Sequence, residues 1–468
     1  MSEYTTTVGL EVHAELKTKS KMFCGCQNDP HTASPNTHIC PVCMAHPGTL
    51  PTVNQKAVEL VLLVGKAIGG TLADYSEFDR KNYFYPDIPK AYQISQYQYP
   101  FVTGGELAGV KITRIHLEED TARSQHEGNK SLVDFNRAGV PLMELVTEPV
   151  IHSAEQAGAF ARELQLLLRT LGVSDANMER GEMRVEVNLS VSKTSKLGTK
   201  VEVKNINSFK AAEAAIVYET KRHIETLQAG GTLVQETRGF DENKGKTFSQ
   251  RIKETADDYR YFPDPDIPKM LRSAIAEWGD EALMAKLKET PTKKRARYAL
   301  LGLPTDQIEI IISDVAREAY FSDVVTGVND EKVVKVLGNY FTSDVIGLLE
   351  SGELLLKSEY ASAFRSLAAL VVSGAINSRV AKDLLQEVVF TGADAASLAE
   401  KRGLIQRSNA DELIPVVDAI IAEHASVVTE FRAGKESVLQ FLVGQGMKAT
   451  KGSANPGVLA DLFRARIL

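Results

Sequence analysis

The stretch Val8-Gly-Leu-Glu-Val-His-Ala-Glu-Leu16 decides the fold of the first part of the chain. Its apolar and polar residues alternate, and this period of two predicts a half-buried strand. Successive side chains of a strand point to opposite faces, so Glu11, His13 and Glu15 should share one face. We therefore expect a sheet with one apolar face and one charged face.

Two further segments have the same alternation. They are Arg184-Val-Glu-Val-Asn-Leu-Ser-Val191 and Lys200-Val-Glu-Val-Lys204, joined by a polar link that ends in glycine. Together they predict an antiparallel hairpin, with Glu186 and Lys204 on its charged face.

Helices alternate with these strands. Start signals at Asn54, Ser153 and Ser208, followed by glycines, predict helices over about 54–69, 153–172 and 208–230. The first part of the chain is therefore predicted to be an α+β domain with a largely antiparallel sheet.

Proline is concentrated at the start of the chain. Ten of the 17 prolines lie within residues 1–150, and only three follow Pro291. Because helix interiors exclude proline, the later part should be helical. The predicted domains are 1–292, an all-α domain over 293–405 and a small helical tail domain over 406–468.

Composition restricts the class of protein. The chain has 468 residues, and 54 basic against 61 acidic residues give a net charge of −7. This balance argues against a protein covered all over with nucleic acid, although it leaves room for a local basic patch. With no apolar run long enough for a membrane helix and no secretory signal at the start, we expect a cytoplasmic protein.

The four cysteines gather in one short window, with Cys24 and Cys26 as one pair and Cys40 and Cys43 as the other. Four thiolates in close pairs suit tetrahedral zinc, and a closed shell of four ligands indicates a structural site. The alternative is four free buried thiols. Three histidines in the same region could each replace a thiolate: His31, His38 and His46.

Acidic residues suggest a second metal site. They comprise Glu11 beside His13, the run His116, Glu118, Glu119 and Asp120, and Glu186 on the hairpin. Carboxylates that converge from separate strands suit a hard divalent cation such as magnesium. For any single one, the alternative is a solvated strand face.

Two basic regions are candidates for phosphate or nucleic-acid contacts. Residues 78–96 interleave tyrosines with Arg80, Lys81 and Lys90, and a similar aromatic cluster recurs at 258–264. The segment 432–468 carries six basic and two acidic residues, a net charge of +4. The alternatives are a tyrosine-rich loop packed on the sheet and an ordinary solvated helical tail.

Together these segments resemble the family of B subunits of the bacterial glutamyl-tRNA(Gln)/aspartyl-tRNA(Asn) amidotransferases. The similar stretches are VGLEVHAELKTKSKMFCGC, CPVCMAHPGTLPTVN, FDRKNYFYPDIPKAYQISQ, RIHLEEDTARS, LVDFNRAGVPLMELVTEP, VEVKNINSF, QETRGFDENKGKT, DDYRYFPDPDIP and LVGQGMKATKGSANP. They occur in the family's order and cover essentially the full chain.

The resemblance implies a fold and an activity. It implies a glutamine synthetase-like catalytic cradle, a helical domain and a tRNA-binding tail. The family activates the side-chain carboxylate of mischarged Glu-tRNA(Gln) or Asp-tRNA(Asn) with ATP and magnesium. Ammonia from an amidase, the A subunit, then forms the amide, and a small C subunit stabilises the complex.

The resemblance and the chemistry together give candidate site residues. The expected catalytic residues are Glu11, His13, Glu118, Glu119 and Glu186. The expected magnesium ligands are Glu11, His13, Glu119 and Glu186, with Glu118 as an alternative. Phosphate or ATP contacts are expected from Arg80, Lys81 and Lys204, and tRNA contacts from Arg432, Lys448, Lys451 and Arg464. The alternative functions are a non-catalytic tRNA-binding scaffold and, less favoured, a stand-alone zinc hydrolase.

Overall fold

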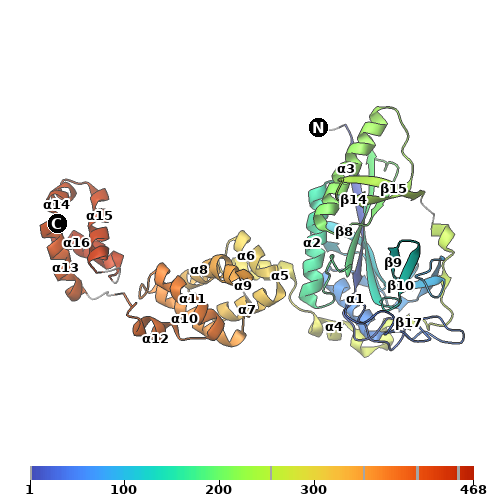
Figure 1. The fold of residues 1–468 in the computed structure, drawn as a ribbon, viewed down its shortest axis with the longest axis horizontal. Helices are drawn as coiled ribbons and strands as arrows, with labels where there is room; N and C mark the ends of the chain where they lie inside the picture. The colour runs from blue at the N-terminus through green and yellow to red at the C-terminus, as the bar shows by residue number, and fades with distance from the viewer. Residues whose placement is uncertain (1–2, 253–255, 352–353, 407–409, 451–453) are drawn as a thin grey trace. The chain divides into compact units, whose positions relative to one another are not determined.

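The structure is a computed structural model that describes residues 3–252, 256–351, 354–406, 410–450 and 454–468. By its internal contacts the chain divides into two units, Met1–Pro291 and Thr292–Leu468. The first unit combines sheets and helices, and the second is helical in its described residues (Figure 1). The predicted division into 1–292, 293–405 and 406–468 stays a prediction.

The predicted strand is the central strand of the first unit. β1 (Thr5–Glu15) lies within a ten-stranded sheet of order β15-β14-β13-β12-β1-β11-β8-β6-β2, and β7 pairs with β8 at one side. The other strands of this sheet are β2 (Thr71–Leu72), β6 (Val102–Thr103), β7 (Glu106–Leu107), β8 (Val110–Glu119), β11 (Pro141–Thr147), β12 (Met183–Ser192), β13 (Val201–Lys204), β14 (Glu236–Asp241) and β15 (Lys246–Ile252).

The predicted hairpin is confirmed, because β12 and β13 pair antiparallel with Val187 opposite Val203. The expectation of a largely antiparallel sheet is confirmed, with one exception among the described strands: β13 and β14 run parallel. The reason is helix α3 (Phe209–Gln228), which connects these two strands and returns the chain to the same end of the sheet. The sheet is therefore mixed, although most of its pairs are antiparallel.

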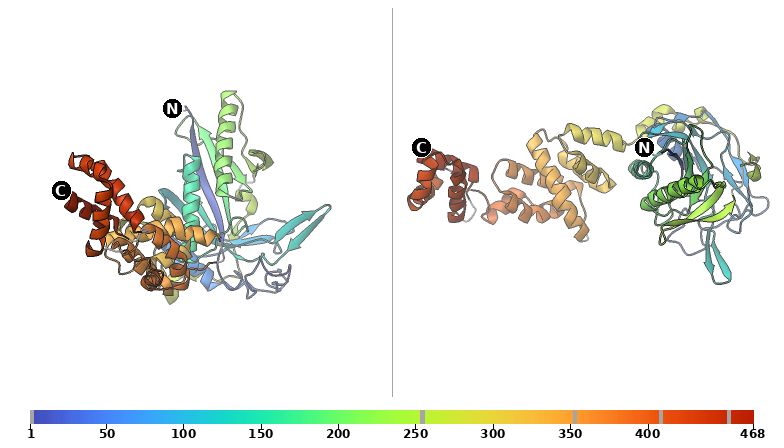
Figure 2. Two further views of the ribbon diagram at one scale, coloured as in Figure 1. Left: turned by 60° about the vertical axis from the view of Figure 1, so that its left-hand side comes forward. Right: turned by 90° about the horizontal axis from the view of Figure 1, so that it is seen from above.

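Three smaller sheets complete the first unit. β9 (Arg123–Glu127) and β10 (Lys130–Asp134) form a hairpin that projects from the unit (Figure 2). β4 (Asp79–Asn82) lies between β5 (Tyr92–Ser95) and β16 (Phe262–Pro263). β3 (Tyr75–Ser76) pairs with β17 (Met270–Leu271).

Helices cover the apolar face of the main sheet. α1 (Gln55–Ala67), α2 (Ala154–Leu171) and α3 contribute to one core with the alternate residues of β1, and α4 (Asp280–Lys286) adds Leu283. α2 and α3 lie side by side along the sheet (Figure 1). All three predicted helices are confirmed, and their first turns are capped by the side chains of Asn54, Ser153 and Ser208. Because this face is covered, the polar residues of β1 point from the opposite face.

The second unit consists of helices in its described residues. They are α5 (Pro291–Leu300), α6 (Thr305–Ile312), α7 (Val315–Val325), α8 (Glu331–Tyr340), a π-helical turn (Phe341–Val345), α9 (Ile346–Ser351), α10 (Ala361–Val372), α11 (Ser378–Thr391), α12 (Ala395–Lys401), α13 (Ala410–Glu423), α14 (Ala425–Arg432), α15 (Leu439–Ala449) and α16 (Pro456–Ile467). α13 to α16 share a hydrophobic core of their own. Across the described ranges, no helix has the length and apolar character needed to cross a membrane.

A buried carboxylate ties α3 to the β14–β15 hairpin. The Glu219 side chain is fully buried and accepts hydrogen bonds from Arg222 Nη2 (2.7 Å) and from the hydroxyl of Thr247, and Arg238 Nε lies 3.2 Å away. Burial alone would raise the pKa of Glu219, but His223, Arg222 and Thr247 outweigh it and lower the pKa from 4.5 to about 2. The folded state therefore favours the carboxylate.

We expect Glu219→Gln to lower the free energy of unfolding by about 3 kcal/mol at pH 7, because folding lowers the pKa of this carboxyl from 4.5 to about 2. The unfolded chain binds the proton near pH 4.5 and the folded chain near 2, so this stabilisation is present above pH 4.5 and is lost progressively below it. Urea unfolding of both proteins at several pH values measures the difference. Glu225→Gln is the control, because Glu225 is an exposed partner of Lys221 and its loss should cost under 1 kcal/mol.

Candidate functional site

The polar face of the main sheet carries a cluster of carboxylates and histidines, which we call the acidic cluster: Glu11, His13, His116, Glu118 and Glu144. The backbone register sets His13 on β1 opposite Glu144 on β11, and Glu144 opposite His116 on β8. One row across three strands therefore brings these side chains together. Nε2 of His13 lies 3.4 Å from Oε1 of Glu118 and 3.4 Å from Oε2 of Glu144. Nε2 of His116 lies 3.3 Å from the same Glu144 oxygen.

Burial and mutual charge control the protonation of the cluster. Burial opposes a charge on His13, but Glu118 and Glu144 outweigh it and raise the pKa of His13 well above its ordinary value. Burial, reinforced by the charges of Glu144 and Glu186, raises the pKa of Glu11 to about 7. Carboxylates therefore crowd this face closely enough that one of them resists ionisation near neutral pH.

The acidic cluster and the neighbouring Glu186 and Glu202 offer three groups that could hold a metal ion. They are Glu11, His13 and Glu144; His116, Glu118 and Glu144; and Glu11, Glu186 and Glu202, with the ligand atoms of each group within 4.8 Å of one another. Carboxylate oxygens are the donors that Mg²⁺ prefers. Nδ1 of His13 is also buried and has no hydrogen-bond partner among the residues that the structure describes. The residues present therefore fit a hard divalent cation.

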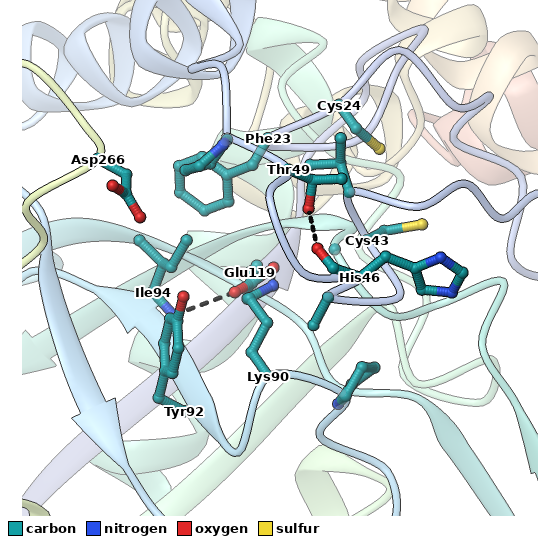
Figure 3. Close-up of a pocket in the computed structure, with 15 residues that line it drawn as sticks. Phe23, Cys24, Cys43, His46, Thr49, Lys90, Tyr92, Ile94, Glu119 and Asp266 are labelled. Atoms are coloured by element: carbon teal, nitrogen blue, oxygen red, sulfur yellow. Dashed lines mark hydrogen bonds and ion pairs between the residues drawn. The ribbon is translucent and has the colours of Figure 1, made fainter.

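Three of the four predicted magnesium ligands lie on this face: Glu11, His13 and Glu186. Glu119 lies elsewhere, because its carboxylate accepts hydrogen bonds from Lys90 Nζ (2.7 Å) and the backbone N–H of Ile94 (3.1 Å). It lines a separate cavity of about 220 Å³ with Phe23, Cys24 and Tyr92 (Figure 3). The structure thus brings the alternative, Glu118, to the acidic cluster in place of Glu119.

Glu144 is absent from the predicted site, and His116 is noted in the sequence without a role. Glu144 is the single charged residue in the strand Pro141–Thr147, whose other residues are apolar apart from Thr147. A lone acid in such a strand is the signal that could have revealed it, because a charge is buried only where it has partners.

Two of the predicted phosphate contacts border the acidic cluster. Lys204 Nζ lies 2.8 Å from Glu186 and 3.7 Å from Glu202. Burial opposes the charge of Lys204, but Glu186 and Glu202 outweigh it and raise its pKa. Burial also opposes the charge of Lys81, which Tyr261 and Glu118 outweigh, so the pKa of Lys81 is raised well above its ordinary value.

Arg80 lies apart from the cluster. Its Nε donates to Asp264 (2.8 Å) and its Nη2 donates to Asp266 (2.8 Å). Both carboxylates belong to the segment that follows β16, so the guanidinium joins two parts of the chain. No contact in the described residues supports a phosphate role for Arg80, because its charge is already paired with two acids.

The four cysteines come together and could hold a metal ion. The sulfurs of Cys24, Cys26, Cys40 and Cys43 all lie within 4.8 Å of one another, and each cysteine is free of a disulfide. The backbone N–H of Cys40 also donates to Cys43 Sγ (3.2 Å). The donor set therefore fits a tetrahedral structural ion.

The predicted tRNA contacts lie in the last four helices or fall outside the described residues. Arg432, Lys448 and Arg464 are exposed on α14, α15 and α16. Arg432 Nε donates to the carbonyl of Ile467 (3.0 Å), and Arg464 lies 3.7 Å from Glu436 and from Asp461. Lys451 lies outside the described residues.

Fold and site together define a class of protein: a mixed α/β unit with an acidic sheet face that could hold a metal ion, followed by a helical unit. Comparison with known proteins narrows the class. Residues 6–276 match the family described as the GatB/GatE catalytic domain, and residues 319–467 match the GatB domain. The chain belongs to the GatB family.

Relatives are similar over the whole chain. The B subunit of the aspartyl/glutamyl-tRNA(Asn/Gln) amidotransferase of Gloeothece citriformis is 40% identical, covering 100% of this chain and 98% of the relative. The protein of the same name in Dehalococcoides mccartyi is 41% identical, with 99% of each chain covered. That of Caldicellulosiruptor saccharolyticus is 42% identical, again with 99% of each covered.

Proposed function

We propose that this chain is the B subunit of a tRNA-dependent amidotransferase. It would activate the side-chain carboxylate of Glu-tRNA(Gln), Asp-tRNA(Asn) or both with ATP, and then form the amide with ammonia. The acidic cluster is the observation that carries this proposal. A pure scaffold has no need to bury several carboxylates around two histidines, since their desolvation costs stability unless a cation or a reaction uses them.

The chemistry of the proposed reaction matches the charges of the site. A carboxylate is a poor acceptor for ammonia, because its oxygens are bad leaving groups. Transfer of a phosphoryl group to it forms an acyl phosphate, from which phosphate leaves readily. This step brings two anions together, so cationic groups must offset their repulsion. Lys81 and Lys204 border the cluster and would contribute positive charge to phosphate oxygens.

Metal ligands are proposed from the same face. Glu11, His13, Glu118, Glu144 and Glu186 would hold Mg²⁺, with Glu118 replacing the Glu119 of our sequence prediction. When bound, the cation would polarise phosphoryl oxygens and stabilise the charge that develops on them. Lys204, paired with Glu186, would orient that carboxylate and share its charge with a phosphate.

Further parts of the proposal come from the family resemblance. The cradle would have a glutamine synthetase-like architecture, and the cysteine cluster would hold structural Zn²⁺. The partners would be the amidase (the A subunit), the small C subunit, and tRNA(Gln) or tRNA(Asn), with the tail residues Arg432, Lys448, Lys451 and Arg464 contacting the tRNA. We expect a cytoplasmic location, where a reducing environment keeps thiols available for zinc.

Amidation by a reconstituted complex tests the function. The chain is combined with the A and C subunits and supplied with glutamine, ATP, Mg²⁺ and either misacylated tRNA. We expect Gln-tRNA(Gln) or Asn-tRNA(Asn) to form only when ATP is present. If neither product forms with either substrate, the proposed function is wrong. If His13→Ala retains full activity in the complex, the scaffold is the better description.

A further inference from the structure

Two tyrosines far apart in the sequence form an aromatic surface beside the acidic cluster. The rings of Tyr97 and Tyr261 stack with centroids 4.5 Å apart and an interplanar angle of 12°. Tyr97 is 51% exposed, so the outer part of this stack is open to solvent. We call this pair the aromatic ledge.

The backbone around the ledge is anchored to β4 at several points. The side-chain amide of Asn82 donates to the carbonyls of Tyr259 (3.1 Å) and Arg260 (2.8 Å). Phe262 pairs with Arg80, whose guanidinium also binds Asp264 and Asp266. On the other side, the carboxylate of Asp79 accepts from the backbone N–H of Tyr97 (2.8 Å).

These anchors explain how an exposed ring keeps its place. An exposed aromatic side chain gains little from burial, and a tyrosine ring on an unpinned loop would move freely. Here both backbone segments are hydrogen-bonded to residues of one strand, so the ledge is pre-formed. The ion pairs of Arg80 thus have a positioning role in this part of the fold.

A line of contacts leads from the ledge to the acidic cluster. Tyr261 contacts Tyr259 edge-on at 6.1 Å, and Lys81 Nζ lies 5.0 Å from the Tyr259 ring centroid. Burial raises the pKa of the Tyr261 phenol, and the charges of Lys81, Glu118 and Glu144 also act on it. One end of the ledge is therefore open to solvent, and the other is connected through Tyr259 to Lys81.

We propose that the aromatic ledge stacks the purine ring of a substrate nucleotide, whose phosphate or sugar extends from there toward Lys81. This inference rests on the proposed function, in which both ATP and the 3′-terminal nucleotide of tRNA supply an adenine. A flat, exposed tyrosine pair accepts any base face, and stacking is the main source of affinity at such platforms. The lysine beyond it provides the positive charge that a nucleotide needs next to the base.

The test compares Tyr97→Ala, Tyr97→Phe and Tyr99→Ala in the reconstituted complex. Tyr99 is the matched control, because it lies two residues further on, is 39% exposed, and packs against Tyr75 rather than Tyr261. We expect Tyr97→Ala to raise one KM by roughly 5- to 100-fold, the range expected for loss of one base–aromatic stack, with kcat nearly unchanged. Tyr97→Phe and Tyr99→Ala should stay within about twofold of the wild type.

Separate KM measurements for ATP and for aminoacyl-tRNA identify the source of the purine. A rise in the KM for ATP alone assigns the ledge to the adenine of ATP. A rise in the KM for aminoacyl-tRNA assigns the ledge to the terminal adenosine. In that case, uncharged tRNA ending in CCA should inhibit Tyr97→Ala less strongly than the wild type. Uncharged tRNA ending in CC, which lacks this adenosine, should inhibit both proteins equally. The inference is overturned if Tyr97→Ala changes neither KM, or if Tyr99→Ala has the same effect.

Direct binding keeps this inference separate from the proposed function. Calorimetric titration of the full chain with ATP, and filter binding of the two tRNAs, require no amidation. A wild-type complex that binds but forms no amide would refute the function alone. If the wild type and Tyr97→Ala bind ATP and both tRNAs with equal affinity, the stacking role of the aromatic ledge is refuted and the proposed function is not.

Discussion

Replacing Glu118 with glutamine should lower the rate of amidation by roughly 10²- to 10³-fold, the usual effect of removing one group that stabilises developing charge. The Glu118 carboxylate lies 3.4 Å from His13 and belongs to a group that could hold a metal ion. Glutamine keeps the size of the side chain but removes its negative charge, so the remaining ligands should bind Mg²⁺ more weakly. The half-maximal Mg²⁺ concentration should therefore rise together with the loss of rate.

Glu119→Gln is the matched comparison, since it makes the same chemical change one residue further along β8. Its amide oxygen can still accept from the N–H of Ile94, although the ion pair with Lys90 is lost. We expect a smaller loss of rate and an unchanged Mg²⁺ requirement. Initial rates of the reconstituted complex, measured across a Mg²⁺ titration, compare the two variants. A shift in the Mg²⁺ requirement for Glu119→Gln but not for Glu118→Gln would contradict this assignment.

The choice between Glu118 and Glu119 shows a limit of predicting site residues from local sequence patterns. Alternation along β1 and along the β12–β13 hairpin correctly predicts which residues share a face, because the period of a strand is a local property. At the end of β8, the two acids are adjacent in sequence and both are buried. The separation of the two depends on the pairing of β8 with β11 and on the position of Lys90, which lies in a loop remote in sequence. Such long-range pairing leaves no local signal.

The sequence likewise could not predict which of Arg80 and Lys81 lies near the acidic cluster. Both are basic residues in an aromatic segment, and alternation on β4 predicts only that they face opposite sides. Which of the two faces the acidic cluster depends on contacts with a distant segment of the chain. Asp264 and Asp266 of that segment bind Arg80 and hold it away from the cluster. These acids are 184 and 186 residues away from Arg80 along the chain. The helices, in contrast, follow from capping residues and periodicity that lie within each segment.

If the cysteine cluster holds a metal ion as proposed, removing that ion should unfold the loop that contains the cluster while the sheet core survives. Between Cys24 and Leu50, Cys43 is the only buried residue, so this long segment, described throughout, has almost no hydrophobic core of its own. A bound ion joined to four thiolates would therefore supply much of its structural stability. The core beneath β1 does not depend on the cluster, because it is formed by the strands and α1 to α3.

We expect Cys40→Ser to purify with less than about a tenth of the zinc of the wild type, because a structural zinc site rarely tolerates the loss of a thiolate ligand. Limited proteolysis should then cut first within residues 24–50, as it should in wild-type protein treated with a strong chelator. His46→Ala is the control, since this histidine lies in the same loop and is not needed for a four-thiolate shell. Metal analysis and mass mapping of the fragments measure both effects. An unchanged zinc content in Cys40→Ser would contradict the four-thiolate site, and loss of zinc in His46→Ala would place a histidine among the ligands.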